Sequence, residues 1–264
     1  LSAGSIAALV AEMDGVDHSV PPVLHTQGGS EHGYRRWQSF VARGGLESYA
    51  RRRNDALDSS GVSRMSAYLN LGMVSPMRLG REVRARARSG APKAHKGGVA
   101  KFMAEFETWR GVSYAFCYHH TPPGATGATL AMLPAWARET LARHAKDPRP
   151  RLVPVADLAR GETGDAVWDA LQASLVRTGE LHNNARMGWG KAVLQWCTGP
   201  EEALAALIGL NDRFALDGHS PPSVGGVMGC FGLFEAPKAE NQVYGKVQKK
   251  GLKRKYMALV NAVK

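Results

Sequence analysis

The fold class is decided by one stretch of sequence, HNNARMGWGKAVLQWC, which spans His182 to Cys197. Its spacing predicts a helix over residues 183–197, preceded by a helix over 165–177 and followed by another over 200–210. The dipeptides Thr178-Gly179 and Thr198-Gly199 separate the three. Trp189 and Trp196 are two helical turns apart, so one face of the middle helix would carry both, about 10 Å apart along the axis.

Outward from this stretch the pattern stays helical. Apolar residues recur at helical spacing over residues 34–49, with a break at Gly44-Gly45. Pro76 is suited to the first turn of a further helix. Other helices are predicted at 62–72, 102–120, 133–144 and 251–263, and the Gly- and Pro-rich residues 217–237 are predicted as loop. Strand signals of useful length are absent. We therefore predict an all-α protein: a helical domain over residues 34–264, preceded by a linker or partial N-terminal segment over residues 1–33.

Composition limits the function classes. The 264 residues are 44% hydrophobic and 22% charged, which supports a folded core. No apolar run approaches the ~20 residues of a membrane helix, and no secretory signal is visible. The chain opens on Leu1 rather than Met, so we expect part of the natural N-terminal region to be missing. Three scattered cysteines without a CxxC pair favour a reducing, intracellular location. In a eukaryote this would be the nucleus or an organelle that contains DNA.

Charge and missing motifs narrow the choice further. The formal net charge is +11, which fits attraction to phosphate groups, although many basic surfaces only keep a protein soluble. Neither HExxH nor a Cys/His zinc spacing is present, so no metal site is expected. The dinucleotide, P-loop and serine-hydrolase motifs are also absent from the sequence.

Two blocks in the first half could bind a ligand. Hydroxyls, an arginine and backbone N–H groups at a predicted helix start suit a phosphate or pyrophosphate, as in the segment Ser63-Arg64-Met65-Ser66. The alternative is an ordinary serine cap. Glu105 and Trp109 lie one helical turn apart, which suits hydrogen bonding to and stacking on a flat heterocycle. Taken alone, the block favours a core tryptophan beside a salt-bridged surface.

Two blocks in the second half could likewise have either a functional or an ordinary structural role. Trp168, Trp189 and Trp196 can approach one another, either as core packing or as a relay for single electrons. Asn211, Asp212 and Asp217 offer an amide and two acids that could hydrogen-bond a ring system, or could simply end a helix.

The order and spacing of these blocks resemble the flavin-binding, α-helical C-terminal domain of the photolyase/cryptochrome family, and most closely its class II DNA photolyases. The resemblance runs from about Gly45 to the basic C-terminal segment, and it implies one bound FAD. It places Tyr49 and Arg53-Asn54-Asp55 near the phosphates. The segment around the pyrophosphate would be Val62, Ser63, Arg64, Met65 and Ser66. The residues beside the isoalloxazine ring would be Asn183, Arg186, Asn211 and Asp217, with Asp217 paired to Arg186.

The resemblance also implies a reaction. Reduced flavin would donate one electron to a cyclobutane pyrimidine dimer in damaged DNA, which is flipped into a cavity lined by Glu105 and Trp109. The tryptophans Trp189, Trp168 and Trp196 would conduct an electron to the oxidised flavin. The family relationship thus favours a relay over simple packing for these three residues. No membrane association is implied, and a monomer is expected.

The chain departs from the class II pattern at the lesion-binding residues. His219 replaces an arginine, and the stretch 226–230 lacks a tryptophan that the family uses to stack on the lesion. Phe231 is expected to substitute in part if the loop follows a shifted path. The polar residues that follow have become Phe234-Glu235-Ala236-Pro237. The N-terminal α/β antenna domain of the family is absent from this sequence.

The leading hypothesis is therefore a light-driven deoxyribodipyrimidine photo-lyase, a carbon–carbon lyase. The alternative is a cryptochrome-like photosensory flavoprotein without repair activity, which the altered lesion residues favour. A third possibility is a helical domain that no longer binds flavin.

Overall fold

The computed structural model describes residues 3–88, 93–125 and 127–261. Its regular structure is helical, as predicted. Within those three ranges no strand forms, although Asn241 and Gly245 make an isolated antiparallel bridge.

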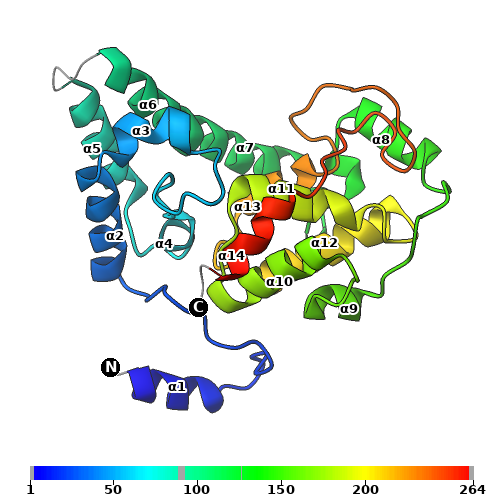
Figure 1. The fold of residues 1–264 in the computed structure, drawn as a ribbon, viewed down its shortest axis with the longest axis horizontal. Coiled ribbons are helices and arrows are strands. Elements are labelled where there is room, and N and C mark those ends of the chain that lie inside the picture. The colour runs from blue at the N-terminus through cyan, green and yellow to red at the C-terminus, as the bar shows by residue number, and fades with distance from the viewer. Residues whose placement is uncertain (1–2, 89–92, 126, 262–264) are drawn as a thin grey trace.

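One group of helices follows the N-terminal segment and encloses a first apolar core. Figure 1 shows this group on the left. It consists of α2 (Ser30–Ala42), α3 (Gly45–Arg52), α4 (Ser66–Asn70), α5 (Pro76–Arg88) and α6 (Lys93–Met103). We call the buried residues between them the first core: Trp37, Phe40, Leu46, Met65, Tyr68, Val74, Leu79, Val83, Val99 and Phe102.

A second group encloses a larger second core, on the right of Figure 1. The helices are α7 (Arg110–His120), α8 (Ala135–Arg143), α9 (Val155–Arg160), α10 (Ala166–Thr178), α11 (Asn183–Val193), α12 (Pro200–Phe214) and α13 (Pro221–Gly229). A short 3₁₀ turn, Leu130–Met132, precedes α8. The second core includes the fully buried Trp168, Leu171, Leu175, Trp189, Leu207 and Phe231.

One long helical rod connects the two groups. It begins with α6, continues through a π-helical segment at Ala104–Trp109, and ends with α7. Figure 1 shows it running along the top of the molecule from one group to the other. The sequence predicted a helix over 102–120 but not the π-helical segment, whose wider turn contains both Glu105 and Trp109. Such segments occur often at functional sites.

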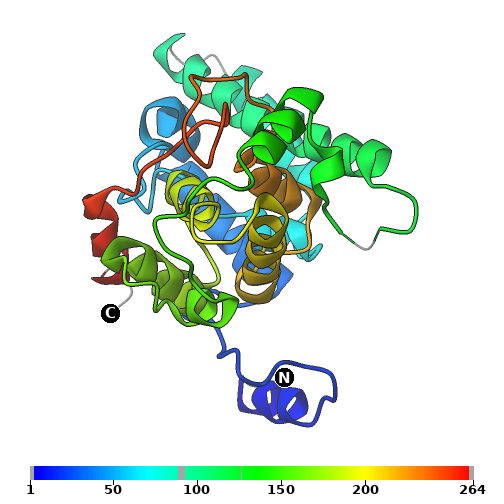
Figure 2. The ribbon, with the colours of Figure 1, turned by 90° about the vertical axis from the view of Figure 1, so that its right-hand side faces the viewer.

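The N-terminal helix stands apart from these groups, whereas the C-terminal segment packs onto the second. The N-terminal helix α1 (Ala3–Ala11) stands apart from the rest in both Figure 1 and Figure 2. Near the C-terminus, a 3₁₀ turn (Arg254–Met257) and α14 (Ala258–Asn261) pack along α10. The predicted closing helix over 251–263 therefore begins later than expected, and its last predicted residues, 262 and 263, lie outside the described residues.

The predicted helix over 183–197 is wrong at its end. Helix α11 stops at Val193, because the N–H groups of Gln195 and Trp196 turn back to Ala192 and Val193. The Trp196 carbonyl instead accepts a hydrogen bond from Val153, far away in sequence. Consequently Trp189 and Trp196 do not share a face of one helix.

The predicted loop over 217–237 contains an unforeseen helix, α13. Its start is capped by the Ser220 hydroxyl, which accepts from the Ser223 N–H. Pro221 and Pro222 fill the first helical positions, where no N–H partner is needed. Helix 62–72 is shorter than predicted, since α4 covers only Ser66–Asn70, and α12 extends past Leu210 to Phe214.

Helices α3 and α6 approach so closely that only glycine fits between them. A Cβ atom on Gly98 would lie 2.2 Å from the Glu47 carbonyl oxygen and 2.5 Å from that of Leu46. Its neighbour Gly97, in the same helix, is exposed and would meet nothing within 4 Å. Substitutions at Gly98 and Gly97 therefore distinguish the effect of backbone contact with α3 from the effect of helix propensity.

We expect Gly98→Ala to lower the free energy of unfolding by about 1–3 kcal/mol, because α6 must move away from α3. The matched variant Gly97→Ala should instead leave stability unchanged or raise it by up to about 1 kcal/mol. Urea unfolding of both variants measures this. Equal effects of the two substitutions would contradict the close approach.

Candidate functional site

The segments that the sequence singled out meet between the two cores. The carboxylate of Glu180, which follows α10, accepts hydrogen bonds from Arg36 at 2.8 Å and from Arg64 at 2.5 Å. Thr26 donates to the same carboxylate at 2.9 Å. Arg64 has a left-handed backbone, with φ at 53°, and its carbonyl accepts from Arg36. Glu180 thus fixes the predicted pyrophosphate segment against the second core.

A second junction joins residues 53–55 to the start of α11. His182 bonds the Arg53 carbonyl through Nε2 at 3.0 Å, and its Nδ1 accepts from the Asn184 N–H. These two roles require a neutral imidazole with the proton on Nε2. Burial lowers the pKa of His182, which favours the same neutral form. The Asn184 amide also donates to the Asn54 carbonyl at 2.8 Å.

Arg186 and Asp217 form the ion pair that the sequence predicted. The guanidinium donates two hydrogen bonds, of 3.1 and 2.7 Å, to the two carboxylate oxygens. Burial opposes the charge on Arg186, yet Asp217 raises the pKa of the guanidinium above its ordinary value. The pair is partly rather than fully buried, with 17% and 20% of the side chains exposed. The adjacent Gly218 carbonyl accepts from Asn70 of α4, which ties this pair to the first group.

The remaining predicted flavin residues surround these junctions. Asn211, near the end of α12, is buried, and its amide nitrogen donates to Asp212 and Ser223. Asn183 begins α11 and is exposed. The pyrophosphate segment has graded exposure: Met65 is buried, Val62 and Ser63 are half-buried, and Ser66 is exposed at the start of α4.

Tyr49 and Glu105 lie on the first group's side of the site. Burial raises the pKa of Tyr49, whose ring packs edge-on against Phe102. Arg53 pairs with Glu105 at 2.7 Å, and Lys101 pairs with the same carboxylate oxygen at 2.6 Å. Glu105 therefore lies between two cationic side chains.

Trp109 is exposed, and the aromatic residue beside it is not the expected one. Phe231 is fully buried in the second core, so the expectation that it replaces the missing tryptophan is wrong. Residues 226–230 belong to α13 and its C-cap, and Gly229 is itself buried. Instead the ring centroid of Phe234 lies 5.6 Å from that of Trp109. His219, in place of the family arginine, is exposed and faces Asp212.

The three predicted relay tryptophans are in contact, in the order Trp189, Trp168, Trp196. Trp168 stacks on Trp189 with centroids 5.7 Å apart and planes inclined by 11°. Trp168 meets Trp196 at 5.6 Å, nearly edge-on. The Trp168 indole N–H donates to the Trp189 carbonyl, and the Trp189 indole N–H to Gln172. All three rings are buried.

Sequence reasoning missed Glu180, Gln172 and Phe234. Glu180 lies next to the left-handed Gly179 that ends α10, a position that the sequence marks as a turn. Gln172 lies one helical turn after Trp168, and nothing in its spacing indicates a partner on α11. Phe234 was noted only as a departure from the family pattern.

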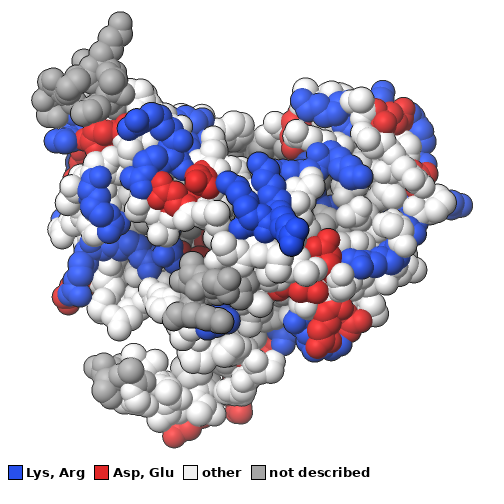
Figure 3. Space-filling view, in the orientation of Figure 1, with Lys and Arg blue, Asp and Glu red and all other residues white. Residues whose placement is uncertain are grey.

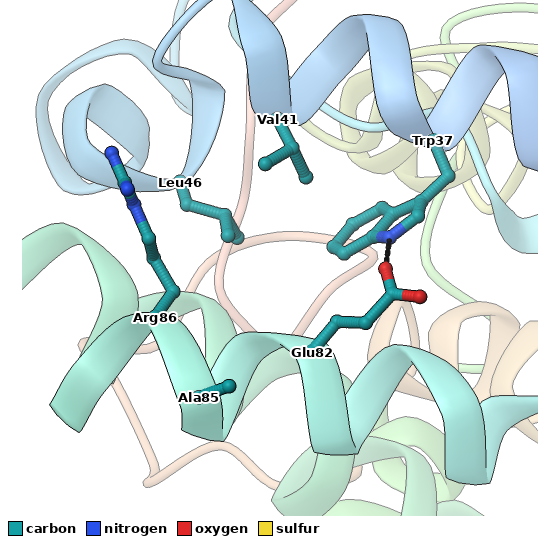
Figure 4. Close-up of a pocket in the computed structure, with 6 residues that line it drawn as sticks. All are labelled: Trp37, Val41, Leu46, Glu82, Ala85 and Arg86. Carbon is teal, nitrogen blue, oxygen red and sulfur yellow. Dashed lines mark hydrogen bonds between the residues drawn. The ribbon is translucent and has the colours of Figure 1, made fainter. Parts of the chain in front are cut away.

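Two surface clefts lie elsewhere. One, of about 270 Å³, opens between α2 and α5 and is lined by Trp37, Val41, Leu46, Glu82, Ala85 and Arg86. Figure 4 shows the Trp37 indole N–H donating to Glu82 across it, at 2.6 Å. The other is lined by polar residues of segment 25–39 together with Tyr68. Neither contains a predicted site residue, so we assign no function to them.

None of the helices among the described residues is long and apolar enough to cross a membrane. Over the same part of the chain, no group of three His, Cys, Asp or Glu side chains is positioned to hold a metal ion.

The curated proteins to which the chain is similar share one name. The chain is 34% identical over 234 residues to a deoxyribodipyrimidine photo-lyase from Methanothermobacter thermautotrophicus, covering 87% of this chain and 49% of that protein. It is 35% identical over 248 residues to the protein of the same name from Potorous tridactylus, covering 91% and 44%. The chain therefore spans slightly less than half the length of these relatives. No family model matches it.

Solved structures share the fold. A Synechocystis cryptochrome aligns with a TM-score of 0.64 at 17% identity, covering 90% of this chain and 46% of that one. A class III photolyase from Agrobacterium tumefaciens aligns with a TM-score of 0.62 at 15% identity, covering 89% and 44%.

The neutral His182 makes the junction between residues 53–55 and α11 sensitive to pH. Its pKa in the folded protein is below the ordinary 6.5. As pH falls below 6.5, His182 is therefore protonated in the unfolded chain before it is protonated in the folded protein. The stability that neutral His182 contributes is lost as the pH approaches its pKa in the folded protein. We expect the stability difference between the parent and His182→Gln to shrink from neutral to acidic pH. Urea unfolding across that range measures it, and a difference that grows on acidification would contradict the assigned protonation state.

Proposed function

Because the chain belongs, in sequence and in fold, to the photolyase/cryptochrome family, we propose that it holds one FAD and uses it for light-driven repair of cyclobutane pyrimidine dimers in DNA, in the manner of class II enzymes. The observation that carries this proposal is the convergence of four segments distant in sequence. Residues 53–55 are hydrogen-bonded to His182 and Asn184, and Arg186 of the same helix pairs with Asp217. Segment 62–66 joins them through Arg64, which bonds Glu180 two residues before His182.

The residues at this junction fit a flavin. Arg186 keeps its Nε buried, with no hydrogen-bond partner among the described residues. A buried donor left unpaired is costly, so it suits an acceptor supplied by a ligand. The Arg64 backbone is strained, which also accords with a ligand-binding segment.

In this proposal each residue has a positioning role. Asn183, Arg186, Asn211 and Asp217 would hold and orient the isoalloxazine, and the segment Val62 to Ser66, with Tyr49, would hold the phosphate side. Bound FAD would supply light absorption and the electron that splits the dimer. The protein would exclude water and fix the distance to the lesion.

We propose that the tryptophans form the path by which an electron reaches oxidised flavin. Ring contacts continue from Trp189 through Trp168 to Trp196, and the Arg151 guanidinium lies 5.0 Å from the Trp196 ring. Arg151 is exposed, so this end of the path is nearest to solvent. The alternative, that the rings only pack the core, predicts no electron transfer.

Trp189→Phe should strongly slow photoreduction of the bound flavin while leaving its FAD content unchanged, because phenylalanine keeps the packing but is much harder to oxidise. Absorbance under blue light with an external reductant measures this. Trp136→Phe, on α8 and outside the path, is the matched control and should behave as the parent. Normal photoreduction by Trp189→Phe would return the three tryptophans to a packing role.

DNA would be the substrate of this site, with the chain acting as a monomer. Figure 3 shows Lys and Arg side chains gathered at the centre of one face, over the C-terminal segment that Figure 1 draws in red. Lys253, Arg254 and Lys255 of this segment are exposed. Such charge would attract the phosphate backbone and make binding depend on salt. Trp109 would stack on a flipped base, and the Glu105 carboxylate would accept from an imide N–H.

A photosensory role without repair is the second candidate. The observation that favours it is the altered lesion region: residues 226–230 carry no aromatic side chain, and His219 stands where class II enzymes have arginine. The structural likeness to a cryptochrome is compatible with either role.

We expect the protein, purified with added FAD and then reduced, to split a pyrimidine dimer in an oligonucleotide under near-ultraviolet light. Chromatography of the products measures repair. Arg186→Ala, which leaves the Asp217 carboxylate unpaired, should retain little FAD and show little repair. A reduced, FAD-loaded parent that splits no dimers at saturating DNA would leave the photosensory role, and a parent that cannot be loaded with FAD would exclude both roles.

A further inference from the structure

We infer that Phe234 forms, with Trp109, an aromatic surface on which an unstacked base of the lesion rests. This inference rests on the proposed function and adds a residue to its substrate site. Phe234 is 43% exposed and Trp109 is 44% exposed, while their ring centroids are only 5.6 Å apart. The two rings, inclined at 59°, come from the end of the π-helical segment and from the segment after α13, which are separate parts of the sequence.

The backbone of Phe234 is held in an unfavourable conformation. Its φ is 61°, in the left-handed region, where a bulky residue is a genuine outlier. Strain of this kind persists only when the surroundings impose it, and it concentrates at functional sites. With 43% of the residue exposed, packing recovers only part of what full burial of a phenylalanine would contribute. Packing alone therefore accounts for only part of the case for an aromatic side chain here.

The surroundings fix the ring from both sides. Beneath it, Phe116 packs edge-on with centroids 5.7 Å apart. The next residue, Glu235, forms an ion pair with Lys191 at 3.1 Å, and Lys191 is 1% exposed. Before it, Leu233 is buried and its N–H bonds the Met228 carbonyl. The ring thus contacts Phe116 and Trp109, both neighbouring residues are held in place, and 43% of Phe234 stays exposed.

The chemistry of this surface suits a nucleobase. Two adjacent aromatic faces provide stacking that tolerates any base, worth about 1–3 kcal/mol per base by alanine substitution. The lesion has lost much of its own stacking, so it leaves the duplex more easily than a normal base pair. Arg110, the residue after Trp109, adds positive charge at the same end of α7. The exposed apolar pair would thus recognise the lesion, whereas basic side chains attract any DNA.

Dark binding tests this inference without depending on the photochemistry. The FAD-loaded protein is titrated into a fluorescently labelled duplex carrying one thymine dimer, and into the undamaged duplex, with anisotropy as the readout. We expect Phe234→Ala to weaken dimer binding about tenfold, the equivalent of losing one stacked base. Binding to undamaged DNA should remain unchanged, and Phe234→Trp should restore the preference.

Two further variants control for folding and for general aromatic loss. Phe234→Gly removes the ring and also relieves the left-handed strain, so it should weaken dimer binding as Phe234→Ala does while unfolding no more easily than Phe234→Ala. Tyr114→Ala removes another exposed aromatic of α7 and should keep the preference for the dimer.

The outcomes separate this inference from the function on which it rests. If the parent prefers the dimer and both Phe234→Ala and Phe234→Gly keep that preference, Phe234 has no part in recognition and the inference is overturned. If the parent binds damaged and undamaged DNA equally, the proposed repair function fails first, and the inference falls with it.

Discussion

The arrangement of the site depends on one carboxylate, Glu180, that joins two separately packed cores. The first core closes around the aromatic residues of α2 and α6, and the second around the tryptophans of α10 and α11. Arg36 and Arg64 reach Glu180 from the first group, and its own backbone follows directly from α10 of the second. A carboxylate with two arginine partners is directional, so it fixes orientation where an apolar contact would allow sliding.

The sequence could foresee the helical fold and the order of the site segments, because both follow from local spacing and from resemblance to a known family. The pairing of Arg186 with Asp217 was foreseen in that way. The end of α11 was not, because the hydrogen bond from Val153 to the Trp196 carbonyl is a tertiary contact with no local signal. Phe234 was missed for a similar reason, since its neighbour Trp109 is more than a hundred residues away. The cap and prolines of α13 were visible, but its glycines outweighed them.

The joint between the cores is mainly polar, and this affects stability as well as geometry. The residues between the cores are joined by ion pairs and by hydrogen bonds such as that from Asn70 to the Gly218 carbonyl. A ligand that binds at this junction stabilises the folded protein by mass action. The gain in free energy of unfolding grows with the logarithm of the ratio of ligand concentration to dissociation constant. Cofactor supply would then set how rigidly the two halves are held together, a coupling that neither core would show alone.

The π-helical segment at Ala104–Trp109 determines how the α6 end of the long rod is rotated relative to the α7 end. Upstream, Gly98 must face α3 at backbone contact, and downstream, Ser113 must face α13, where a Cβ on Gly225 would lie 2.8 Å from its hydroxyl. An uninterrupted α-helix advances about 100° per residue, so one residue more or fewer would turn one end by that angle relative to the other. The wider turn absorbs this offset. The π-helical turn therefore sets how far the α7 end of the rod is rotated relative to the α6 end. This rotation lets Gly98 face α3 while Ser113 faces α13.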